Sequence, residues 1–209
     1  MPMVRGVLWI AALGALFCGC IQSKPPPAIT FSPPPRIAVL FFANDTPYPG
    51  LSGIYEVIVT LRLIQKGYTV MPSWEAAGKL RSVGVTGAET LGKLNWKVVS
   101  LACENYPLYV HGCVLEHSAI DIGIARNPRT GIGLTMVDSG GNVIWKDAVI
   151  LSRPSVKFSA LTSTEAMVAA LIERLGRGST DGLFSRKAIG QMVQSVDLLL
   201  LKWPAVGGS

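Results

Sequence analysis

Hydrophobic positions after residue 35 follow two periodicities, and together they predict alternating strands and helices. The run Arg36–Phe42 is short, continuous and rich in β-forming residues, which predicts a buried strand. From Ser52 to Gly67 the apolar residues recur every three or four positions, which predicts a helix that ends at the glycine. The same periodicities predict further strands at Tyr68–Met71, Pro107–Ser118, Ile132–Asp138 and Val143–Leu151, and further helices at Ser73–Val83, Thr86–Cys103, Thr164–Leu175 and Arg186–Leu201.

This order of elements predicts an α/β fold, a single-domain sandwich with a mixed sheet flanked by helices. We expect the early strands to pair through right-handed helical crossovers. We expect the last three strands to form an antiparallel meander, because Ser139–Asn142 (Ser-Gly-Gly-Asn) is a hairpin signal. The domain is predicted at residues 36–203, followed by a short tail at 204–209, with no second domain and no internal repeat.

Residues 1–19 have the pattern of a signal peptide. Arg5 precedes the apolar run Val7–Phe17, which is too short to span a bilayer because a spanning helix takes about twenty residues. Gly19 stands directly before Cys20, and this pair resembles the lipobox of bacterial lipoproteins. The resemblance implies cleavage before Cys20, a diacylglycerol on its thiol, and a fatty acid such as palmitate on its new amine. The alternative is an uncleaved N-terminal anchor helix.

A proline-rich segment, residues 20–35, separates Cys20 from the predicted domain. Six of its residues are proline. Proline fixes φ and has no backbone N–H to pair, so the segment is predicted to be an extended, semi-rigid tether. At roughly 3.1 Å per residue it would hold the domain about 40 Å or less from a membrane. A proline-rich recognition ligand is the alternative interpretation.

Composition and charge narrow the class of protein. Hydrophobic residues make up 49% of the 209 residues and charged residues 15%, the reverse of the balance in a disordered chain. The net charge of +6 is spread along the sequence without a block of Lys or Arg, which argues against a nucleic-acid partner. Four cysteines are too few for a disulfide scaffold.

The candidates for chemistry are weak. His111, Cys113 and His117 are predicted on one face of the same strand, but a separation of six residues spans about 20 Å, so one metal ion could not bind all three. The chain has no Gly-x-Ser-x-Gly elbow, and its Gly-x-Gly precedes a strand rather than a helix. We therefore expect a non-catalytic protein without a metal or cofactor.

Two further pairs of residues leave alternatives open. Cys103 and Cys113 are the cysteines outside the predicted signal and anchor, and they are either bridged in a disulfide or remain buried thiols. Trp145 is interpreted as a residue that covers the sheet or as an interface anchor. Trp203 follows Leu198–Leu201, which is apolar nearly all round, so this region is predicted to serve as core, as a self-association surface or as a lipid contact.

Several motifs then occur in a recognisable order. Asn44-Asp45-Thr46-Pro47 follows the first strand, the first helix ends in Lys66–Pro72, and Met136–Trp145 contains the hairpin. This order resembles the family of bacterial lipoproteins of unknown function typified by a meningococcal genome-derived surface antigen. The hairpin is similar to one in curli-secretion (CsgG-type) and penicillin-binding-protein activator lipoproteins, which share a fold like the TolB N-terminal domain. The chain departs from those hairpins in having Ser139–Asn142 where Thr-Gly is commoner.

The resemblance implies a lipid-anchored envelope protein. Its implied role is a structural or adaptor component of an outer-membrane assembly or export system, with other envelope lipoproteins, CsgG-type ones among them, or copies of itself as partners. Ile21 follows Cys20 where an inner-membrane lipoprotein usually has Asp, so we expect an outer-membrane location, facing the periplasm or the cell surface. The alternative function is a periplasmic binding module for a lipid, peptide or glycan.

Overall fold

The structure, a computed structural model, describes residues 30–31, 34–91, 95–121, 126–152 and 186–206. The predicted signal peptide, Cys20 and the predicted helix at Thr164–Leu175 lie outside the described residues. The strands are β1 (Thr30–Phe31), β2 (Arg36–Asn44), β3 (Thr69–Met71), β4 (Leu108–Asp121), β5 (Arg126–Asp138), β6 (Val143–Leu151) and β7 (Ala205–Val206). The helices are α2 (Leu51–Gln65), α3 (Ser73–Arg81), α4 (Ala88–Leu91), α5 (Trp96–Ala102) and α7 (Arg186–Leu201).

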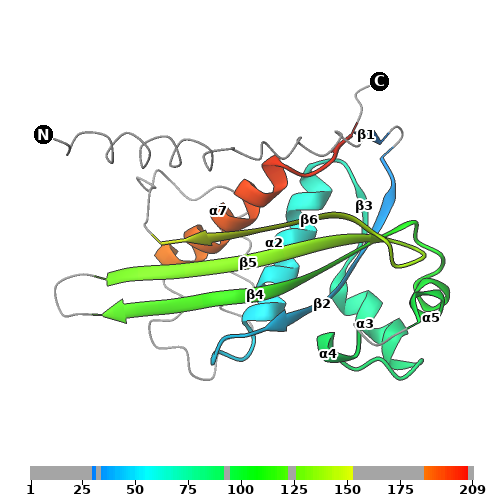
Figure 1. Cartoon of the computed structure of the whole chain (residues 1–209), viewed down its shortest axis with the longest axis horizontal. Coiled ribbons are helices and arrows are strands. Elements are labelled where there is room, and N and C mark those ends of the chain that lie inside the picture. Colours follow the sequence, from blue (N-terminus) through cyan, green and yellow to red (C-terminus); the bar gives the residue numbers. More distant parts are fainter. Residues whose placement is uncertain (1–29, 32–33, 92–94, 122–125, 153–185, 207–209) are drawn as a thin grey trace, which may run out of the picture.

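The main sheet has five strands in the order β3-β2-β4-β5-β6 (Figure 1). Strand β2 pairs in parallel with both β3 and β4, whereas β4, β5 and β6 form an antiparallel meander. The sheet is therefore mixed, which confirms the predicted α/β fold. The parallel strands need helical crossovers, and α2 supplies the one between β2 and β3.

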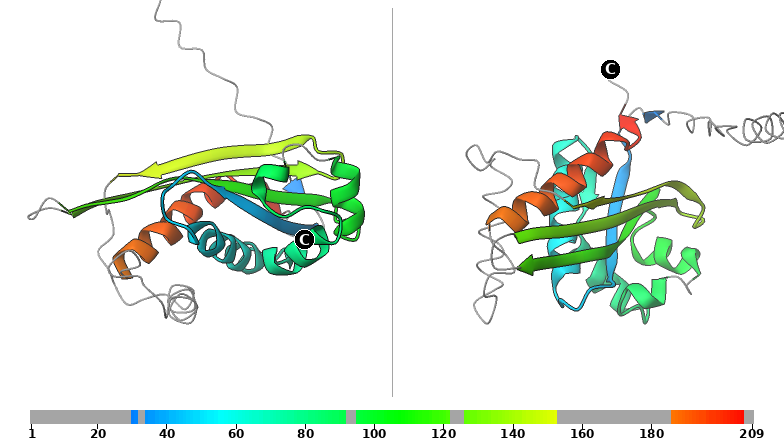
Figure 2. Two further views of the ribbon diagram at one scale, coloured as in Figure 1. Left: turned by 90° about the horizontal axis from the view of Figure 1, so that it is seen from below. Right: turned by 60° about the vertical axis from the view of Figure 1, so that its left-hand side comes forward.

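Helices α2 and α7 cover one face of the sheet and form the larger core with it (Figure 2). Ile37 and Val39 of β2 point into this core, while Ala38 and Leu40 point to the opposite face, where α3 and α5 form a smaller core. Because both faces are buried here, β2 is apolar at consecutive positions. Burial on both faces explains the continuous apolar run that predicted this strand.

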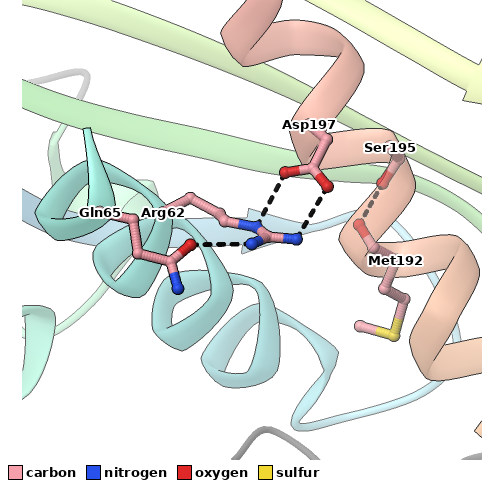
Figure 3. A network of polar contacts seen from close by, with 5 residues as sticks. All are labelled: Arg62, Gln65, Met192, Ser195 and Asp197. Carbon is pink, nitrogen blue, oxygen red and sulfur yellow. Dashed lines mark hydrogen bonds and ion pairs between the residues drawn. The ribbon is translucent and has the colours of Figure 1, made fainter. Parts of the chain in front are cut away.

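Helices α2 and α7 are joined at the surface by a forked ion pair (Figure 3). Arg62 Nε lies 2.8 Å from one oxygen of Asp197, and a terminal nitrogen of the same guanidinium donates to the other oxygen at 2.8 Å. Gln65 Oε1 accepts a third hydrogen bond from Arg62 at 2.8 Å. The planar guanidinium matches a carboxylate in this geometry, so the pair fixes the contact between the two helices as well as attracting them.

The predicted helix Thr86–Cys103 is wrong as a continuous element. The structure has α4 and α5 instead, and Asn95 caps the start of α5 by accepting a hydrogen bond from the Lys97 backbone N–H at 3.0 Å. Asparagine competes for backbone hydrogen bonds and so favours a helix N-cap over a helix interior. After α5, Glu104 and Asn105 both take positive φ values, 56° and 54°, and turn the chain into β4.

A second, two-stranded sheet was not predicted. Strand β1 pairs in parallel with β7, with Thr30 opposite Ala205 and Phe31 opposite Val206. The Tyr68 hydroxyl donates to the Pro204 carbonyl at 2.8 Å, which ties the segment after α2 to the chain that leads into β7. Within the described residues no helix is both long and apolar enough to span a bilayer.

Candidate interaction surface

The tryptophans singled out by sequence lie against each other. The rings of Trp145 on β6 and Trp203 after α7 meet edge to face with centroids 4.7 Å apart. Trp203 is 5% exposed and belongs to the larger core, and Trp145 is half-buried beside it. Lys202 and Asp147 flank the pair with an ion pair of 2.8 Å. Of the alternatives left open for Trp203, the structure places it in the core, where it secures the C-terminal segment to β6.

The hairpin between β5 and β6 is built around Asp138. Its Oδ1 accepts hydrogen bonds from the backbone N–H groups of Gly140 (2.8 Å) and Asn142 (2.9 Å), and its Oδ2 accepts from the Asn142 side chain (2.9 Å). These donors, the Asn142 side chain foremost, hold the pKa of Asp138 below its ordinary value. Gly141 has φ +86°, and a Cβ there would lie 2.5 Å from Cγ of Trp96. The second glycine therefore lets the hairpin tip rest on the Trp96 ring.

The predicted common face of His111, Cys113 and His117 is wrong. A register shift between Val114 and Glu116 interrupts the pairing of β4 with β5, so His117 points to the face covered by α2. His111 stays on the other face beside Trp96, with ring centroids 6.1 Å apart. Burial, and to a smaller extent Lys146, lowers the pKa of His111. Among the described residues no group of three His, Cys, Asp or Glu side chains could hold a metal ion.

Cys103 and Cys113 are free thiols, so the disulfide alternative is not realised in the structure. Cys103 caps the end of α5 and is buried in the smaller core, whereas Cys113 lies on β4, five residues beyond its first residue Leu108. Cys113 therefore lies about 16 Å along the extended strand from Leu108. Cys113 Sγ instead donates to Asp45 Oδ2 at 3.1 Å.

Both thiols are held in the protonated form. Burial raises the pKa of Cys103 to about 11. Burial, together with the neighbouring Asp45 carboxylate, raises the pKa of Cys113 to about 11. A thiol with so high a pKa is almost entirely un-ionised at neutral pH and is a poor nucleophile or metal ligand.

A buried polar chain that sequence reasoning missed crosses the larger core. The Tyr55 hydroxyl lies 2.7 Å from Thr130 Oγ1, and Thr130 Oγ1 lies 3.5 Å from His117 Nδ1. Tyr48 covers the His117 ring edge to face at 5.7 Å. Burial raises the pKa of Tyr55, so its hydroxyl stays protonated and can serve the chain as a hydrogen-bond donor or acceptor. These hydrogen bonds link α2 to β4 and β5 in the interior, so the three residues have a structural role.

Glu56 is a half-buried polar group that the sequence did not reveal. The pairing of β2 with β4 shifts register between Val39 and Phe42, and the Phe42 N–H at this shift donates to Glu56 Oε1 at 2.9 Å. Burial raises the pKa of Glu56 above its ordinary value. The Glu56 carboxyl group therefore accepts a hydrogen bond from a backbone N–H at an irregular point of the β2–β4 pairing.

In the described part of the chain, the face of β4, β5 and β6 that lies opposite α7 is a surface open to a partner. Gly131 and Gly133 of β5 have no side chains there, and Ile150 of β6 lies across Gly131 while Leu115 of β4 lies beside Gly133. Ile150 is 53% exposed and Leu115 37%. We call Leu115, Gly131, Gly133, Ala148 and Ile150 the open strip.

The open strip includes part of β6, which is an edge of the five-stranded sheet. The sequence signal that could have indicated the open strip is Gly131 and Gly133. They lie two residues apart and so on one face of the strand, where two residues without side chains leave the surface flat. In chemical terms the strip offers apolar contact together with backbone donors and acceptors along the edge strand. This combination suits contact with another protein.

No protein-family model and no curated protein sequence matches the chain. Among solved structures the chain is similar to lipoprotein GNA1162 from Neisseria meningitidis, at 16% identity and a TM-score of 0.53 over 69% of this chain and 100% of that one. It is also similar to PelC from Paraburkholderia phytofirmans, solved as a dodecamer, at 16% identity and a TM-score of 0.51 over 88% of this chain and 96% of PelC. At these identities the likeness shows a shared fold, the mixed α/β sandwich described above.

Proposed function

We propose that this chain is a cell-envelope lipoprotein with a non-catalytic role, a structural or adaptor component of an outer-membrane assembly or export system. Cys20 would carry the lipid, and the proline-rich segment would link the α/β domain to the membrane. The observation that carries the proposal is the combination of a lipobox-like Gly19-Cys20 with a domain that has the fold of a solved lipoprotein.

The chemistry of the described side chains supports a binding role over a reaction. Both described cysteines have a pKa of about 11, and the Tyr55–Thr130–His117 chain is enclosed in the core. A catalytic group must reach a substrate and must carry a pKa matched to its task. These groups serve the fold instead.

The open strip and the β6 edge are the surface that we propose for contact with partners, whether other envelope lipoproteins or copies of this chain. PelC, which shares the fold, was solved as a dodecamer. An edge strand of nine residues beside an apolar strip offers the groups that strand addition and side-chain packing need.

The anchor is tested by the intact mass of the protein extracted from the membrane fraction. We expect the mass of residues 20–209 plus the acyl chains, and a Cys20→Ala variant that is neither cleaved nor acylated. A mass equal to the whole chain, or to a cleaved product without acyl chains, would contradict the lipoprotein proposal.

The partner surface is tested by native mass spectrometry and by crosslinking in the intact envelope. An Ile150→Lys variant places a charge in the open strip, and a Trp74→Lys variant places one on α3, where Trp74 is 62% exposed. We expect Ile150→Lys to reduce the assembled fraction and Trp74→Lys to leave it unchanged. Equal assembly of the two variants would exclude the strip as the interface.

A further inference from the structure

Three segments distant in sequence meet at one end of the domain (Figure 1). Strand β1 pairs with β7, and β7 begins four residues after α7 ends at Leu201. The hydrogen bond from Tyr68 to Pro204 brings the end of α2 to the same place. We call this region the β1–β7 end of the domain.

The position of Cys20 in the sequence ties this end to the membrane. Thr30 of β1 comes ten residues after Cys20. Ten residues reach at most about 36 Å when fully extended. A domain of this size is about 40 Å across, so a lipid on Cys20 keeps the β1–β7 end, rather than the opposite end, within reach of the lipid headgroups.

The β1–β7 end exposes apolar side chains from the last turn of α7. Leu201 is 77% exposed, and Leu198, one turn earlier, is 37% exposed. Residues three apart on a helix lie on the same face, so the two leucines project together. They stand apart from Leu199 and Leu200, which are buried in the larger core.

Among the described residues, the charges at this end are unbalanced in favour of a cation. Asp197 is paired with Arg62, and Asp147 is paired with Lys202, so both carboxylates are already neutralised. Lys66 directly follows α2 and is exposed, and no carboxylate is paired with it in the described part of the chain. A surface with exposed leucines and a lysine that no described carboxylate pairs with complements an anionic lipid headgroup region.

We propose that the β1–β7 end rests on an anionic phospholipid bilayer, with Leu198 and Leu201 entering the boundary between headgroups and acyl chains. Lys66 lies at headgroup level, where its ammonium group pairs with lipid phosphate. This inference rests on the proposed function, because the lipid on Cys20 is what holds the domain at the bilayer. It gives the anchored domain a fixed orientation and turns the open strip of β4–β6 away from the lipid toward partners.

The test uses the full-length protein reconstituted into vesicles of phosphatidylethanolamine and phosphatidylglycerol that contain a spin-labelled quencher lipid. A bimane fluorophore is placed at Leu201→Cys or, as the matched control, at Ile150→Cys. Ile150 is also an exposed apolar residue, but it lies near the far end of β6 on the opposite face of the sheet from α7. The unsubstituted protein is the labelling blank for Cys113.

We expect at least about twofold stronger quenching at position 201 than at position 150, since interfacial residues lie within quencher range. A Lys66→Gln substitution, or replacement of phosphatidylglycerol by phosphatidylcholine, should weaken the quenching at position 201 by about twofold or more, as expected for contact with anionic headgroups. Flotation of the protein with the vesicles is measured in the same samples and reports the anchor.

The outcomes separate this inference from the proposed function. Flotation with equal quenching at the two positions overturns the membrane contact and leaves the anchor intact. Equal quenching at position 201 in neutral and anionic vesicles overturns the assignment of an anionic lipid. Failure to float overturns the anchor, and the membrane contact with it.

Discussion

Replacement of Gly141 by alanine should destabilise the domain far more than the same change at other glycines of similar conformation. Gly141 has φ +86°, and an added Cβ would lie 2.5 Å from Cγ and 2.7 Å from Nε1 of Trp96. The left-handed conformation alone costs an alanine about 1–2 kcal/mol. Displacing a packed ring adds about 1–3 kcal/mol, so the expected total loss in unfolding free energy is about 2–5 kcal/mol.

Gly84 provides the matched control, because its φ is +84° and nothing lies within 4 Å of an added Cβ. Gly84→Ala should therefore cost only the backbone strain of about 1–2 kcal/mol. The difference between the two variants, about 1–3 kcal/mol, isolates the contact of the hairpin tip with Trp96.

The assay is urea unfolding of the detergent-solubilised protein, followed by far-UV circular dichroism. In a Trp96→Ala background the Gly141→Ala change should fall to the strain cost alone, which gives a coupling energy of about 1–3 kcal/mol in the double-mutant cycle. If Gly141→Ala and Gly84→Ala lose equal stability, or if the cycle shows no coupling, the hairpin tip does not rest on Trp96 and the reasoning is wrong.

Three further outcomes are expected. Glu56→Gln should be at least as stable as the unsubstituted protein at pH 7, and Glu56→Ala about 1–3 kcal/mol less stable, because only alanine leaves the Phe42 N–H without its acceptor. Burial raises the pKa of Glu56, so its favourable contribution to stability is complete below the unfolded pKa of about 4.3 and is lost as pH rises through the higher folded pKa. Urea unfolding measured as a function of pH should show this loss in the unsubstituted protein and not in Glu56→Gln. Iodoacetamide at pH 8 should modify Cys103 and Cys113 about a hundredfold more slowly in the folded protein than in urea, since a thiol pKa of about 11 leaves little thiolate, and a two-dalton mass change on reduction would contradict free thiols. Trp203→Ala should cost about 3–5 kcal/mol in thermal or urea unfolding, because it empties a buried site against Trp145, and a loss below about 1 kcal/mol would contradict its place in the core.

Sequence patterns predicted the elements whose burial is regular. Strand β2 is buried on both faces and therefore shows a continuous apolar run, and α2 shows helical periodicity because one side of it faces the sheet. The hairpin between β5 and β6 was also predicted, because Ser139–Asn142 supplies the turn residues that the meander needs.

The errors arise where a local irregularity or a long-range contact decides the structure. The register shift in β4 after Val114 moves His117 to the other face, and a strict two-residue alternation cannot reveal such a shift. Asn95 starts a new helix within a stretch of helical periodicity. The contact of Gly141 with Trp96 joins positions 45 residues apart, which no local pattern encodes.

Local sequence patterns also could not reveal the candidate surfaces, because these depend on contacts between distant segments. Strands β1 and β7 have two residues each, too few to show any periodicity, yet their pairing places part of the proline-rich segment beside the chain that follows α7. The apolar stretch Leu198–Leu201 was predicted as core, self-association surface or lipid contact, and the structure divides it: Leu199 and Leu200 are buried, whereas Leu198 and Leu201 are exposed. Only the position of β1 shows that the exposed pair lies at the end of the domain nearest the predicted anchor. The pairing of β1 with β7 thus supports a membrane contact for the two leucines. Their exposure alone would not, because an isolated exposed leucine is ordinary on a protein surface.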